Sequence, residues 1–175
     1  REWSVFSGNL LLGLFIAGVC RSCKFANVLL YAMAIVAGIL FFQFFLSYLM
    51  AFITGIQMLH VNVLFSGFSN PRFFGQFQVL VMPVLAFLVL RHLMGLRMLS
   101  VILFIVLSMS WCISYSLGGR GLWLALMVSH VYLFFFEGKF WRIFLVESLA
   151  AALGGGLFLT MFFLVPAWLG IDAVL

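Results

Sequence analysis

The chain has 175 residues, of which 67% are hydrophobic and only 7% are charged. Soluble domains are about half apolar and about a quarter charged, so this composition excludes a free soluble protein. It also excludes an intrinsically disordered chain, because disorder requires low hydrophobicity and high charge. With a mean hydropathy of +1.32, the sequence predicts an integral membrane protein.

Long apolar runs predict an all-α helix bundle with about six membrane spans, since one span takes roughly 20 apolar residues. The expected spans are residues 5–20, 26–50, 75–90, 98–117, 122–136 and 143–169. A transmembrane barrel would instead show alternating apolar and polar residues. We expect a single transmembrane domain over residues 1–175. Because the chain begins with Arg1 and stops just after an apolar run, we expect it to be part of a longer protein.

The few charges sort by alternate connections. Six of the nine lysines and arginines lie in the first, third and fifth connections, namely Arg21, Lys24, Arg91, Arg97, Lys139 and Arg142. Cytoplasmic connections are rich in these residues, so the pattern places both chain ends and the connections 51–74 and 118–121 on the outer side. The net charge of +5 follows from this topology. Since the basic residues form no patch, we do not expect nucleic acid as a partner.

The cysteines and histidines do not predict a metal site. Cys20 and Cys23 form a C-x-x-C pair without a second ligand pair nearby. We interpret them, and Cys112 within a span, as small packing or interfacial residues. His92 is expected to be solvated in a cytoplasmic connection. His130 lies within a span, where an interhelical hydrogen bond is favoured over a role in a proton relay.

The last span contains an acid and three consecutive glycines. Glu147 lies one turn inside the span, where we expect it to pair with Arg142 or Lys139 or to snorkel to the interface. Glycines 154–156 permit a close helix approach or a kink. The 23 phenylalanines suit lipid contact or a groove for a lipid chain, and composition does not separate the two.

Arg72 is an outward arginine that topology does not explain. Ser69-Asn70-Pro71 is a helix-start signature, in which Asn70 caps a helix whose first position is Pro71. Arg72 then lies in the first turn, beside free backbone N–H groups, and Gln76 follows one turn later on the same face. A guanidinium at a helix N-terminus suits an anion.

Arg120 repeats this arrangement on the same side of the membrane. It lies between Gly119 and Gly121, which let the backbone approach a ligand closely, and it opens the span that follows. The glycine spacing does not match a nucleotide-binding loop. Two such arginines suit a pyrophosphate, and the alternative is that they bond lipid phosphates or loop carbonyls.

The two stretches resemble motifs of the O-antigen ligase and polymerase superfamily, which includes protein O-oligosaccharyltransferases. They read Phe68-Ser69-Asn70-Pro71-Arg72-Phe73-Phe74-Gly75-Gln76 and Ser116-Leu117-Gly118-Gly119-Arg120-Gly121-Leu122-Trp123-Leu124-Ala125-Leu126, the second with one glycine more than the family pattern. The resemblance implies a polytopic C-type glycosyltransferase-like fold, larger than this chain, in the bacterial inner membrane. It implies transfer of a glycan from undecaprenyl pyrophosphate to lipid A-core or a protein such as pilin, at the periplasmic face and without a metal or cofactor.

The resemblance also assigns roles to residues. Arg72 and Arg120, with Asn70 and Gln76 of the first motif, would bind the pyrophosphate. A histidine in a large periplasmic loop would activate the acceptor, and that loop is expected after the last span, outside this chain. His60 precedes the first motif, so we do not assign it that role. The alternatives are an O-antigen polymerase, a non-catalytic membrane subunit packed in a larger assembly and, ranked last, a transporter or channel.

Overall fold

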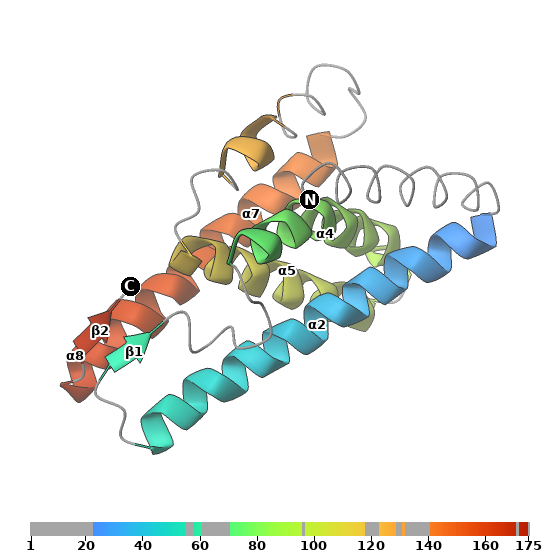
Figure 1. Ribbon diagram of the computed structural model, residues 1–175. Coiled ribbons are helices and arrows are strands. Elements are labelled where there is room, and N and C mark those ends of the chain that lie inside the picture. The colour runs from blue at the N-terminus through green and yellow to red at the C-terminus, as the bar shows by residue number, and fades with distance from the viewer. Residues whose placement is uncertain are drawn as a thin grey trace, which may run out of the picture.

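The computed structural model describes residues 23–54, 58–60, 71–95, 97–117, 123–128, 131, 141–170 and 172–174. Almost all of this part of the chain is helical (Figure 1). Within the described residues, four helices are long and apolar enough to cross a membrane. They are α2 (Cys23–Ile53), α4 (Pro71–His92), α5 (Arg97–Leu117), and a continuous last helix made of α7 (Trp141–Leu159), η1 (Thr160–Leu164) and α8 (Val165–Leu169).

These helices confirm the expected spans at 26–50, 75–90, 98–117 and 143–169. The span expected at 5–20 lies outside the described residues. Of the span expected at 122–136, only 123–128 and 131 are described, and they are helical. The described residues therefore establish a helical chain with four candidate spans, consistent with a multi-pass membrane protein.

The boundaries of α4 follow from its sequence. The helix begins at Pro71, as predicted, because a proline at the first position loses no helical hydrogen bond. It ends at His92, and a short turn follows in which the Gly95 amide donates to the His92 carbonyl at 3.1 Å. The hydroxyl of Ser100 then donates to the Val89 carbonyl at 2.9 Å, which fixes α5 antiparallel to α4.

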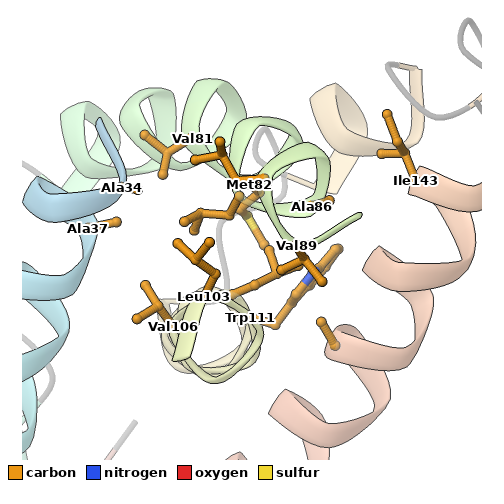
Figure 2. Packing of buried hydrophobic residues seen from close by; sticks show 14 of the residues in the cluster. Ala34, Ala37, Val81, Met82, Ala86, Val89, Leu103, Val106, Trp111 and Ile143 are labelled. Carbon is orange, nitrogen blue, oxygen red and sulfur yellow. The ribbon is translucent and has the colours of Figure 1, made fainter. Parts of the chain in front are cut away.

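Helix α5 is the centre of the described bundle. In its span 56% of the residues are buried, compared with 17% in the span of α2. Apolar residues of α4 such as Met82 and Val89 pack against Leu103 and Trp111 of α5 (Figure 2). The face of α2 that points away from α4 and α5 exposes large apolar side chains such as Ile39, which suits contact with lipid.

Helices α5 and α7 approach each other closely at Gly154. A Cβ atom there would overlap the Ser108 carbonyl oxygen and would lie 2.6 Å from Trp111 Cβ and 2.9 Å from the Cys112 amide nitrogen. At Gly156 nothing lies within 4 Å of such an atom. The predicted close approach is thus confirmed at Gly154, where the missing side chain lets the two backbones meet.

The two ends of the bundle differ in character. At one end, called the strand end here, β1 (Met58–His60) pairs in parallel with β2 (Asp172–Val174), so the segment after α2 lies beside the segment after α8 (Figure 1). At the other end, called the basic end, residues near the start of α2 contact the end of α4, and α5 and α7 begin. The described residues Arg91, Arg97 and Arg142 are all exposed there.

Candidate functional site

Of the predicted arginine site, the structure describes Arg72 and Gln76 of α4. Arg72 is the second residue of α4 and therefore lies in its first turn. Gln76 follows one helical turn later with an exposed side chain. Asn70 and Arg120 lie outside the described residues, as does any contact between the two arginines. The described part of the site is thus a helix N-terminus that carries an arginine, opposite the basic end.

Helices α2 and α4 are joined by polar contacts at the basic end. Arg91 Nη1 donates a hydrogen bond to Asn27 Oδ1 at 2.6 Å. His92 Nε2 lies 2.6 Å from the Tyr31 hydroxyl, so the tautomer of the histidine decides which of them donates. The prediction of a solvated His92 in a connection is therefore wrong. The helix extends two residues past the expected end of the span at Leu90, which brings the histidine against α2.

Snorkelling to the interface was one of the two expectations for Glu147, and its side chain does not snorkel. It is fully buried and lines a cavity of about 330 Å³ between α5, the segment with residues 123–128 and 131, and α7. Glu147 shares one face of α7 with Ile143, Ala150 and Gly154, which are all buried. That face packs against α5, so the carboxyl group lies inside the bundle. The side chain of Arg142 is exposed at the surface.

Aromatic rings connect α5 with its neighbours next to this cavity. Trp111 is 5% exposed, and its ring centroid lies 5.5 Å from that of Trp123. Tyr115 lies 4.9 Å from Trp123 and 6.0 Å from Phe158 of α7. Among the described residues, the indole N–H of Trp111 has no hydrogen-bond acceptor. The sequence analysis did not single out Trp111, because nothing in an apolar span marks one tryptophan as buried.

Gln78 is a second buried polar residue that the sequence analysis missed. It is 2% exposed, and its Nε2 donates to the Ser110 carbonyl at 2.9 Å. Its Oε1 has no partner in the described part of the chain, and Gln78 is one of the residues that line a cavity of about 10 Å³. The signal was available, because Gln78, Met82, Leu85 and Val89 follow helical spacing and are all buried.

A π-helical turn, η1, interrupts the last span at Thr160–Leu164. Inside it, the carbonyl of Met161 accepts a hydrogen bond of 2.6 Å from the Tyr48 hydroxyl of α2. Such turns occur frequently at functional positions in helices. The contact joins the first and last described helices, and no local residue pattern predicts it.

The described residues contain no group of three or more His, Cys, Asp and Glu side chains that could hold a metal ion. Cys112 is buried in α5 as a free thiol, in agreement with its predicted packing role. No family model, curated protein or solved structure matches the chain. The resemblance to the ligase and polymerase superfamily therefore rests on the two sequence motifs.

Proposed function

We propose that the chain is the membrane part of a glycosyltransferase that uses a lipid-linked donor. It transfers a glycan from undecaprenyl pyrophosphate to lipid A-core or to a protein acceptor, at the periplasmic face of the bacterial inner membrane. One observation carries the proposal: α4 begins at Pro71, so Arg72 lies in its first turn at the end of the bundle opposite the basic end. The motif around Arg120 supplies the second arginine.

The chemistry of the reaction suits these residues. Breaking the bond between sugar and pyrophosphate leaves negative charge on the departing pyrophosphate, which must be stabilised. A guanidinium is always charged and donates paired N–H groups, and the free amides of a first helical turn donate in the same direction. Such donors are more effective at a membrane boundary than in bulk water, because the dielectric constant is lower.

Gln76 and Asn70 extend the same site. Gln76 lies one helical turn after Arg72 in α4, so we propose that its amide donates to the same anion. Asn70 would cap the helix and fix the direction of its first turn. These residues offer no general base for the acceptor hydroxyl, and the resemblance assigns that role to a histidine beyond this chain.

Substitution of the arginines tests the proposal. In the full-length protein, Arg72→Ala and Arg120→Ala should each lower glycan transfer by about 100-fold or more, since loss of one stabilising donor costs that much. Arg72→Lys should also impair transfer, because the paired donors are lost. Transfer from a purified lipid-linked donor is the measurement, with membrane accumulation checked by immunoblot.

Arg142→Ala is the matched control, because this arginine is exposed at the basic end and should leave transfer unchanged. Full activity of both Arg72→Ala and Arg120→Ala would refute the proposal. Product length separates a polymerase, which extends the glycan on its lipid carrier, from a ligase or protein glycosylase, which moves it to another acceptor.

A non-catalytic membrane subunit is the second candidate. The span of α2 is only 17% buried, so most of this helix is free to contact lipid or the helices of a partner protein. Reconstitution separates the candidates. Turnover of a lipid-linked donor by the isolated chain would exclude the subunit, whereas activity that appears only with a copurifying protein would favour it.

A further inference from the structure

We propose that the last span is hinged at its π-helical turn η1 and that Tyr48 of α2 locks this hinge. The turn lies between α7, which packs on α5 at Gly154, and α8, in which residues 167–169 are all exposed. Sharp bends in helices occur mostly at prolines and at π-helical turns, and here Pro166 closely follows η1. The hinge concerns motion of the helix and does not depend on the proposed glycan transfer.

The carbonyl of Met161 has no backbone donor at either of the usual helical positions. In an α-helix its donor would be the amide of Val165, four residues later, but that amide donates to the Thr160 carbonyl. In a π-helix the donor would be the amide five residues later, which belongs to Pro166 and carries no N–H. The π-helical turn and the proline together therefore leave this carbonyl without a partner at either position.

Tyr48 supplies the missing donor from a neighbouring helix. Its side chain is 6% exposed, and its hydroxyl donates to the Met161 carbonyl at 2.6 Å. Met161 lies about 12 Å inside the last span, measured from its end at Leu169, where a bilayer offers no water to bond a carbonyl. The ring of Tyr48 lies 6.1 Å from that of Phe162, centroid to centroid, which positions the hydroxyl. The lock thus consists of one buried hydrogen bond and the ring contact beside it.

The segment beyond the hinge, α8 with β2, is able to move because little of it is packed. Pro166 is buried, but Trp168 is 88% exposed and Leu169 is 51% exposed. β2 pairs with β1, which follows α2, so a change of bend would carry the segment after α2 with it. On the other side of the hinge, Gly154 brings α7 against the backbone of α5, so that part of the span stays in place.

Distances between spin labels test the hinge. In a cysteine-free variant, labels at Leu153→Cys and Leu169→Cys lie on either side of η1, about 24 Å apart along the helix axis. Both positions are exposed, so a label fits without repacking. Tyr48→Phe should shift or broaden the distance distribution of this pair in lipid nanodiscs, because the Met161 carbonyl can then gain a donor only through a change of bend. An unchanged distribution would overturn the proposal.

Labels at Leu145→Cys and Leu159→Cys are the matched control. Both positions are exposed and lie in α7, on the inner side of the hinge, about 21 Å apart. Their distance distribution should be the same with Tyr48 and with Tyr48→Phe. Equal broadening of both pairs would mean that the substitution loosens the whole bundle, and it would count against a hinge.

A double-mutant cycle tests whether Pro166 is the reason for the lock. Tyr48→Phe alone should lower the thermal midpoint in detergent by about 3 °C or more, because it leaves a buried carbonyl unpaired. Pro166→Ala restores an amide at the spacing that Val165 and Thr160 use. In that background, Tyr48→Phe should lower the midpoint by at most about half as much. Equal shifts in the two backgrounds would refute the role of Pro166.

Tyr31→Phe is the control for this cycle. It removes a hydroxyl from the same helix, but that hydroxyl bonds the His92 side chain at the basic end rather than a backbone carbonyl. Its effect on the thermal midpoint should be the same with and without Pro166→Ala, because distant sites act independently. Coupling of Tyr31 to Pro166 as strong as that of Tyr48 would contradict a specific lock.

Discussion

Buried polar side chains in this bundle satisfy their hydrogen bonds in two different ways. Apart from Ser100, the serines of α5 bond within their own helix: for example, Ser110 donates to the Val106 carbonyl and Ser114 to the Ser110 carbonyl, at 2.9 and 2.8 Å. Such bonds make a hydroxyl inexpensive to bury in a membrane helix. Gln78 instead reaches from α4 to α5 and uses only one of its two polar atoms in the described structure.

The stability effect of Gln78 follows from this arrangement. Gln78→Met keeps an unbranched side chain and removes the unsatisfied oxygen, while the Ser110 carbonyl keeps its bond from Ser114. The free energy of unfolding should therefore change by no more than about 1 kcal/mol. Gln78→Ala should cost about 2 kcal/mol or more, because it leaves a cavity.

Thermal unfolding in detergent measures both Gln78 variants. A cost above about 2 kcal/mol for Gln78→Met would contradict the prediction. It would mean that Gln78 Oε1 has a partner such as a water molecule, for which the adjacent cavity of about 10 Å³ is just large enough.

For individual residues, the sequence predicted which residues stand at a helix start. It did not predict which neighbouring helices surround a given side chain. Arg72 and Gln76 stand in a helix-start motif that can be read locally. His92 was predicted to be solvated, and it contacts Tyr31 of α2 instead. Glu147 was predicted to pair with Arg142 or Lys139 or to snorkel to the interface, and it is fully buried within the bundle. Their surroundings depend on which side of each helix meets another helix. In spans that are apolar nearly all round, that side is not marked by the pattern.

Among the helical elements, the contact between α5 and α7 depends on a single glycine. Gly154→Ala should destabilise the protein by about 1–3 kcal/mol, because the new Cβ would meet backbone atoms of Ser108 and Cys112 that have little freedom to move. The thermal midpoint of the purified protein in detergent, together with its yield in membranes, measures the effect.

Gly156→Ala provides the comparison from the same glycine run. It has open space around it, so it should be neutral or stabilise the protein by up to about 1 kcal/mol through better helix propensity. Equal effects of the two substitutions would show that helix packing at Gly154 is not the cause.

The elements themselves were largely predictable. Apolar runs longer than a span define α2, α5 and the last helix, and the Asn-Pro signature defines the start of α4. The π-helical turn and the pairing of β1 with β2 were not predicted. The hydrogen bond from Tyr48 to Met161 in the π-helical turn and the pairing of the two strands each join segments more than 100 residues apart in the chain. A local sequence window contains no information about such partners.

For the molecule as a whole, the direction of each helix relative to the membrane is the main testable property. Met94 lies at the basic end and Thr54 near the strand end, and both are exposed. The positive-inside rule places Met94 in the cytoplasm and Thr54 outside. In a chain lacking Cys20, Cys23 and Cys112, an impermeant maleimide should label Thr54→Cys on intact membranes and Met94→Cys only after the membrane is opened.

The reverse labelling pattern would place Arg72 in the cytoplasm and would remove the basis for a periplasmic reaction. The result therefore bears on function as well as on topology. The sequence predicted the membrane character of the whole chain from composition alone, because burying so many apolar residues requires lipid. It did not predict how the helices pack, since α5 is central only because α4 and α7 both pack on it.

The π-helical turn at Thr160–Leu164 has a consequence for chain length. Such a turn contains one residue more than an α-helical turn, so it takes up an extra residue without rotating the helix on either side. Deleting one residue here would restore regular α-helix and leave Phe158 and Pro166 on their present faces. A deletion near Ala150 would rotate all later residues by about 100° and would turn Phe162 away from α2. The π-helical turn is therefore a position in the last span at which deletion of a single residue should be tolerated.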